Sequence, residues 1–249
     1  NASGITASGY IDVSYNSLST DVGSNTYRAY DVEKRGFALQ VIDLAIAYQP
    51  ASGFGGFVQL DYGPDAKVNG GATVGSTADD IEAQEAYMQY AKGPFTVMGG
   101  KFATLAGYEV IESPSNVNFS RSLLFFWAEP ATHTGVRASY AVSDALKFTA
   151  GMNNGWDVLR ETQQTAATDG QRAMGKTLEL GVSATPVKPL SLSLAYYKGK
   201  ESGGATTPAD RSLIDAARAS ACLAVRKRRS AHTSRRPSSM CWRHSGSSS

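Results

Sequence analysis

The stretch KTLELGVSATPVKPLSLSLAYYKG (176–199) contains two runs in which large apolar residues alternate with polar or small ones. Leu or Val occupies every second position from Leu178 to Val182, and Leu does so again from Leu190 to Leu194. Successive side chains of a β-strand point to opposite faces, so each run predicts a strand with one apolar and one polar face. The proline-containing segment between the runs marks a tight turn. The stretch therefore predicts an antiparallel hairpin.

The same alternation recurs along most of the chain. It is clear at residues 9–15 and 57–62 and weaker at residues 37–48, 83–90, 95–102, 134–140 and 146–152. Near Ile42 and Asp43 the phase slips, as it does at a β-bulge, where one strand gains an extra residue. With a further strand starting near Ser212, we predict about ten strands, close to the roughly 9–11 residues each that a membrane-crossing β-strand needs.

The connections between these strands alternate in length. Short ones made of turn-forming residues are expected at 49–53, 91–94, 142–145 and 185–189, and long ones near 17–34, 63–81, 103–132, 154–173 and 199–211. Short turns on one side and long loops on the other are typical of an antiparallel up-and-down β-barrel in an outer membrane. A soluble two-sided β-protein with a solvated face is the alternative, but it gives no reason for loops to sort by length.

Aromatic residues mark both ends of the predicted apolar face. Tyr48, Tyr90 and Tyr140 precede short turns, and Tyr62, Phe102 and Tyr196 precede long loops, as in aromatic girdles at two lipid–water interfaces. We expect the polar face to line a water-filled lumen, because charges on so many strands are incompatible with a dry core. The predicted lumen-facing charged residues are Asp12, Asp61, Glu85, Lys101, Arg137, Lys147 and Glu179.

Charge divides the chain into two parts. Of the 24 Lys and Arg residues, eight lie in 216–249, which has no Asp or Glu, so 1–215 carries 16 basic against 22 acidic residues, a net charge of −6. Every Tyr and Phe lies in 1–215, which also lacks cysteine, as suits a protein that crosses an oxidising compartment. The chain begins at Asn1 without a leader, so we expect an exported protein whose signal peptide has been removed.

The segment GGKFATLAGYEVIESPSNVNFSRSLLFFWAEPATHTGVRASY (99–140), followed by GMNNGWD (151–157), resembles the OmpL-like β-barrel porins of Gram-negative outer membranes. The matching pieces are Gly100–Phe102, Gly107–Ile111, Asn116–Arg121, Pro130, Thr132–Arg137 and Asn154–Asp157, together with GYIDVSYN (9–16) and GPDA (63–66). The resemblance covers about residues 8–215, with its motifs in family order. It implies an outer-membrane pore for small hydrophilic solutes or ions, without a particular solute.

The resemblance stops at DRSLIDA (210–216), where the family continues with further hairpins and a closing aromatic strand. Residues 216–249 are instead rich in Arg and Ser, a composition that an out-of-frame reading of GC-rich coding sequence produces and that cannot bury an apolar face. We therefore expect a partial barrel over 1–215 and a disordered tail over 216–249. A genuine basic arm for anionic partners is the alternative, although an outer-membrane protein meets no nucleic acid.

The longest connection, 103–132, is the predicted constriction loop. Its Leu123–Trp127 segment is too apolar to extend into water, so we expect the loop to fold into the barrel. The candidate constriction residues are Glu109, Glu112, Arg121 and Glu129 of the loop with Lys101 and Arg137 of the wall. Facing acids and bases would order dipolar solutes by a transverse field; equally, these residues would simply pin the loop to the wall.

An open pore needs no catalytic residue, cofactor or metal, and we expect none. His133 lacks a marked serine and acidic partner for a hydrolase, so a structural role is expected. The tail residues Cys222, His232, Cys241 and His244 match no zinc-finger spacing. Expected partners are outer-membrane lipid and small hydrophilic solutes, with a homo-oligomer left open. The alternatives to a porin are a non-conducting barrel that acts as an adhesin or anchor, and a barrel enzyme.

Overall fold

The computed structural model of the chain describes residues 4–19, 30, 33–69, 81–159, 176–188, 190–201 and 209–220. Their dominant element is one ten-stranded antiparallel sheet in which each strand pairs with its neighbours in the sequence. The strands are β1 (Ile5–Ser17), β2 (Arg35–Tyr48), β3 (Gly53–Tyr62), β4 (Ile81–Lys92), β5 (Phe95–Ala103), β6 (Thr132–Ser143), β7 (Leu146–Asn153), β8 (Thr177–Val187), β9 (Leu190–Glu201) and β10 (Ala209–Ser220). The predicted up-and-down order is confirmed.

The connections alternate as predicted. Two to four residues join β2 to β3, β4 to β5, β6 to β7 and β8 to β9, and the other connections are longer. Gly93 adopts φ +57° in the β4–β5 turn, a conformation that favours glycine. In their described parts, the long connections contain two short α-helices, α1 (Pro64–Asn69) and α2 (Leu123–Trp127), and a 3-10 turn (Ser113–Ser115). Among the described residues, no helix has the length and apolar character needed to cross a membrane.

Apolar and polar side chains occupy opposite faces of the sheet. The predicted lipid-facing residues Val13, Leu60, Leu180, Leu192 and Leu194 are all exposed on one side, the outer face. Their neighbours Ser14, Gln59, Asp61, Glu179 and Ala195 are buried on the other side, the inner face. The prediction of an apolar outer and a polar inner face is therefore confirmed for these strands.

The phase slip in β2 comes from a bulge two residues earlier than predicted. Val13 pairs with Leu39 and Asp12 pairs with Val41, so Gln40 is the extra residue, and it is buried on the inner face. Its amide donates to Ser14 Oγ at 2.7 Å, which holds the bulge. A second bulge lies at Gln84 in β4, between the pairs Gln59–Glu85 and Leu60–Ala83.

Two predictions about β5 are wrong. Phe102 pairs with His133 and is buried on the inner face beneath the Arg137 guanidinium, so it is not part of an outer aromatic girdle. Phe95 and Phe102 are seven residues apart, and an odd separation puts them on opposite faces. Lys101 pairs with Ala86 and does not project from the wall, because its ammonium turns towards β4.

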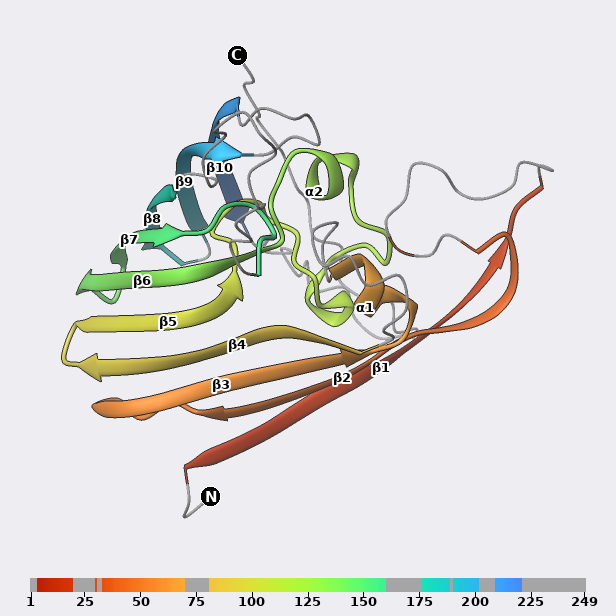
Figure 1. The fold of residues 1–249 in the computed structure, drawn as a ribbon, viewed down its shortest axis with the longest axis horizontal. Helices are drawn as coiled ribbons and strands as arrows, with labels where there is room; N and C mark the ends of the chain where they lie inside the picture. Colours follow the sequence, from red (N-terminus) through yellow and green to blue (C-terminus); the bar gives the residue numbers. More distant parts are fainter. Residues whose placement is uncertain are drawn as a thin grey trace, which may run out of the picture.

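The connection between β5 and β6 (104–131, the inner loop) lies against the inner face. Figure 1 shows the sheet curving around this loop and around both helices. Phe125 of α2 packs with Tyr30 and Ile111, whereas Leu105 and Ala106 pack with Ala195 and Tyr197 of β9. The predicted inward fold is confirmed, although the other four side chains of α2 remain exposed.

The last strand extends beyond the expected boundary at residue 215. β10 pairs with β9 through Ser220, so residues 216–220 belong to the sheet because their backbones continue the ladder. Residues 221–249 lie outside the described part of the chain. Within the described strands, β1 pairs only with β2 and β10 only with β9, which leaves two open edges.

The assignment of faces predicts opposite effects for neighbouring substitutions in β9. Leu194→Arg places a charge on the outer face and should weaken insertion into bilayers by about 2–4 kcal/mol, whereas Ser193→Arg projects inward and should insert normally. Insertion is measured as the fraction of refolded protein retained in lipid vesicles across a urea titration. Normal insertion of Leu194→Arg together with failure of Ser193→Arg would show that the faces are reversed.

Candidate pore-lining site

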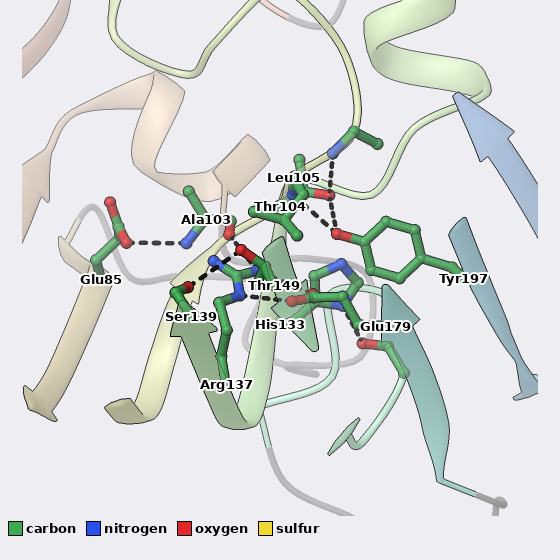
Figure 2. Close-up of polar contacts among 12 residues, drawn as sticks. Glu85, Ala103, Thr104, Leu105, His133, Arg137, Ser139, Thr149, Glu179 and Tyr197 are labelled. Carbon is green, nitrogen blue, oxygen red and sulfur yellow. Dashed lines mark hydrogen bonds and ion pairs between the residues drawn. The ribbon is translucent and has the colours of Figure 1, made fainter. Parts of the chain in front are cut away.

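Arg137 of β6 is the centre of the polar contacts on the inner face (Figure 2). Its Nε lies 2.5 Å from Glu179 Oε1 and its Nη2 lies 2.9 Å from Glu179 Oε2, a bidentate pair with β8. Nη2 also donates to the Ala103 carbonyl at 2.9 Å, and the guanidinium covers the Phe102 ring at 4.1 Å from its centroid. One side chain therefore joins the wall to the start of the inner loop.

Two further wall residues fix the beginning of the loop. Glu85 of β4 accepts a hydrogen bond from the Ala103 amide at 2.8 Å, and the Tyr197 hydroxyl of β9 accepts one from the Leu105 amide at 2.8 Å. Figure 2 shows both side chains reaching the loop from opposite sides of Arg137. A methyl group on Gly181 would meet the end of the Leu105 side chain, which would have to shift, so the loop lies close against β8 here.

The middle of the loop is held against β1, β3 and β4. Glu112 Oε1 accepts from Gln84 Nε2 at 2.5 Å and from Gln59 Nε2 at 3.2 Å. The neighbouring Ser113 hydroxyl donates to Asp12 Oδ2 at 2.5 Å. The loop thus crosses the inner face from β9 to β1. Most of the hydrogen bonds that attach it join a carboxylate to an uncharged donor.

Arg121 and Glu109 organise the loop itself. Arg121 donates to the carbonyls of Phe119 and Ile111 and its guanidinium lies 4.4 Å from the Tyr30 ring centroid. Glu109 accepts hydrogen bonds from the amide and the hydroxyl of Ser122, the N-cap residue of α2. Neither residue meets Lys101 or Arg137, so the predicted facing of acids and bases across an opening is not what the structure contains.

Two carboxylates, those of Asp215 and Glu129, lie next to Gly107. The Gly107 amide donates to Asp215 Oδ2 of β10 at 2.9 Å, and a side chain at this position would collide with the Glu129 carboxylate. Gly107 also has φ +84°, a conformation that favours glycine. Burial, reinforced by the charges of Asp215 and Glu109, raises the pKa of Glu129 to about 7. Glu109 and Glu129 line a cavity of about 330 Å³ within the loop.

Lys101 is committed to β4. Its ammonium forms an ion pair with Glu82 and donates to the Ala83 carbonyl at 2.8 Å. The β4–β5 ladder ends at the Ala86–Lys101 pair, so no β5 amide reaches the Ala83 carbonyl. That carbonyl accepts a hydrogen bond from the lysine ammonium instead. Lys147 shares the inner register with Thr149 but is exposed next to a short turn.

Several carboxylates of the inner face have no direct ion-pair partner among the described residues. Arg137 is paired with Glu179 and Lys101 is held beside β4 by Glu82, whereas Glu112 and Asp12 are held by amides and a hydroxyl. Asp43 of β2 likewise accepts from Gln59 Nε2 at 2.6 Å. Arg121 Nη2 lies 3.3 Å from the same Ser113 hydroxyl that donates to Asp12, so this carboxylate has a cation one hydroxyl away.

His133 is a buried structural residue in the described part of the chain. Its Nδ1 lies 3.0 Å from the Gly155 carbonyl oxygen, and its ring stacks on Tyr197 at 4.8 Å between centroids. No group of three or more His, Cys, Asp or Glu side chains within the described residues is placed to hold a metal ion.

Sequence reasoning missed several residues of this site. It assigned no function to Gln84, Tyr197 or Asp215. Asp43 was noted only as the place where the alternation of residues 37–48 slips. A bulge placed at Gln40 makes the alternation from Ile42 to Ile46 regular and points Asp43 inward, so the inner position of Asp43 could have been predicted. The contact of Asp215 could not, because only the folded loop brings Gly107 to β10.

The buried pair predicts a large loss of stability when one partner alone is removed. Glu179→Gln leaves the Arg137 charge uncompensated and should lower the unfolding free energy by about 3–5 kcal/mol. The double substitution Arg137→Met/Glu179→Leu removes both charges and should cost less. Urea unfolding in lipid vesicles measures both. Equal losses for the single and double variants would contradict a paired role.

The raised pKa of Glu129 predicts pH-dependent attachment of the inner loop. Between the ordinary carboxyl pKa near 4.5 and about 7, the attached loop binds more protons than the detached loop, so attachment weakens as pH rises through this range. From pH 6 to pH 8, hydrogen-exchange protection of the loop amides should fall, at most about tenfold because solvent screens a half-buried group.

Glu129→Gln should remove this dependence, whereas Asp144→Asn, in the exposed β6–β7 turn, should keep it. An identical pH response in the wild type and Glu129→Gln would refute the role of Glu129.

The comparisons agree with this geometry. The chain matches over residues 4–218 the model of a protein family described as "Putative beta-barrel porin-2, OmpL-like". The match covers the whole described sheet apart from the last two residues of β10. No curated protein matches the chain. An antiparallel up-and-down sheet with an apolar outer face, a charged inner face and an inward loop fits an outer-membrane barrel, and this chain belongs to the OmpL-like β-barrel porin family.

Proposed function

We propose that this protein forms a water-filled, cation-preferring channel for the passive diffusion of small hydrophilic solutes or ions across a Gram-negative outer membrane. The observation that carries the proposal is the distribution of partners on the inner face. Lys101 and Arg137 are each neutralised by a carboxylate, while Asp12, Asp43 and Glu112 are bound only by neutral groups. A narrow passage lined by carboxylates without a direct ion-pair partner concentrates cations.

The inner loop supplies the constriction in this proposal. It crosses the inner face and is fixed to β1 by Ser113, to β4 by Glu112 and to β10 by Gly107. Such multiple attachment keeps the loop from moving aside with each solute. In this arrangement Glu112 contributes to the field, whereas Arg121 and Glu109 maintain the shape of the loop.

The selectivity test uses reversal potentials in planar bilayers under a KCl gradient. The wild type should prefer K⁺, and Asp43→Asn/Glu112→Gln should shift the reversal potential towards that of Cl⁻ because it removes two uncancelled charges. Asp144→Asn is the matched control, since this carboxylate lies in an exposed turn away from the inner loop. An unchanged reversal potential in the double variant would refute the proposed origin of selectivity.

Removing residues 113–127 tests the constriction. The deletion eliminates α2 and the Ser113 contact with β1, and single-channel conductance should rise. Vesicle flotation verifies insertion of both proteins. If both insert stably and neither passes current, the channel proposal fails and the non-conducting adhesin or anchor takes its place.

A further inference from the structure

The inner loop encloses a cavity of its own, the loop cavity, which measures about 330 Å³. Its lining residues are Tyr108, Glu109, Val117, Asn118, Ser122, Leu124 and Glu129. Cavities that bind small molecules measure about 300–1,000 Å³ and combine apolar walls with a few polar groups. The loop cavity has the size of a small site of this kind and the same mixed lining.

The two carboxylates of the loop cavity differ in their partners. Glu109 accepts hydrogen bonds from the amide and the hydroxyl of Ser122. Glu129 is half-buried, yet its carboxylate accepts no hydrogen bond from a described residue and forms no ion pair with one. The charged groups that act on it are Glu109 and Asp215 of β10, and both are acidic. Glu129 is therefore the group that gains most from a positively charged partner.

The rest of the lining restricts the shape of that partner. Val117 and Leu124 present aliphatic side chains that are 47% and 44% exposed, and Tyr108 adds an aromatic ring. A metal ion would leave these groups uncovered, and no cluster of three or more acidic, His or Cys side chains within the described residues is placed to hold one. An organic cation covers the apolar walls with its hydrocarbon body while its charged end meets the carboxylates.

We propose that the loop cavity binds a protonated primary amine with a compact hydrocarbon body. The ammonium is held by Glu129 and Glu109, and its three donors are enough for both carboxylates. The hydrocarbon body packs on Val117 and Leu124. An anion of the same size is repelled by the carboxylates, and a neutral molecule leaves the Glu129 charge without a partner. This inference deepens the proposed function and rests on it in one respect, that such amines reach the loop as solutes of the channel.

Binding at this site depends on pH through Glu129. A carboxyl group with a pKa of about 7 is mostly protonated at pH 6 and mostly ionised at pH 8. A primary alkylamine carries its proton at both pH values, so the site alone changes its charge between them. Competition with the proton should therefore weaken amine binding about tenfold at pH 6 relative to pH 8.

Isothermal titration calorimetry on the full-length chain in detergent micelles tests the charge requirement, with the heat of empty micelles subtracted. The probes are phenethylamine, the neutral phenethyl alcohol and the anion phenylacetate. At pH 8 the wild type should bind the amine roughly tenfold or more tightly than the alcohol and should not bind the anion. Glu129→Gln should weaken amine binding roughly tenfold to 100-fold and remove its pH dependence. Asp144→Asn, in the exposed β6–β7 turn, should behave as the wild type does.

A second pair of variants tests the cavity itself. Val117→Phe places a ring in the loop cavity and should abolish amine binding, whereas Val110→Phe, at an exposed valine of the same loop outside the cavity, should not. Equal affinity for the amine and the alcohol, unchanged affinity in Glu129→Gln, or unchanged affinity in Val117→Phe would each overturn the proposal. These measurements need no current, so a chain that binds without conducting contradicts only the proposed channel, and one that conducts without binding contradicts only this site.

Discussion

A sheet that separates lipid from water must direct apolar side chains to one face and polar side chains to the other along the whole length of every strand. This constraint shapes the molecule more than any single contact. It explains why Leu180 and Leu194 are exposed while Glu179 and Ala195 next to them are buried. It also explains the two bulges, because an extra residue changes the phase and allows glutamine to enter the inner face at Gln40 and Gln84.

The polar inner face makes an inward loop possible. A dry core would penalise the many carboxylates of the wall, but here the Gly107 amide and the Ser113 hydroxyl of the loop, together with the bidentate Arg137 of β6, satisfy several of them. Arg137 is central because it joins β8, β6 and the loop start through one guanidinium. Glutamines serve Glu112 without cancelling its charge, so the same contacts that position the loop preserve a negative field.

The edges of the sheet impose a second requirement. Lipid cannot hydrogen-bond to backbone groups, so the free sides of β1 and β10 must be paired when the protein lies in a bilayer. β10 reaches Ser220 and carries Arg218 on the outer face opposite Leu192, near the short-turn end. There its long side chain reaches the interface, where an arginine costs little.

The sequence by itself determined the strands, their order, the alternation of short and long connections and the faces of the strands apart from the end of β5. Those features depend on period-two alternation and turn residues, which are local properties that 176–199 already displays. It also singled out the connection predicted at 103–132, because the apolar Leu123–Trp127 segment is poorly suited to an external loop.

Only the tertiary structure decided which charges meet. Glu109 contacts Ser122, Lys101 contacts Glu82, and Glu112 contacts two glutamines. These partners come from segments whose approach depends on how the loop lies across the sheet. The pairing of Gly107 with Asp215 spans 108 residues and leaves no local pattern to read. Alternation gives the face of a residue, whereas the partner on that face depends on the path of the loop and the curvature of the sheet.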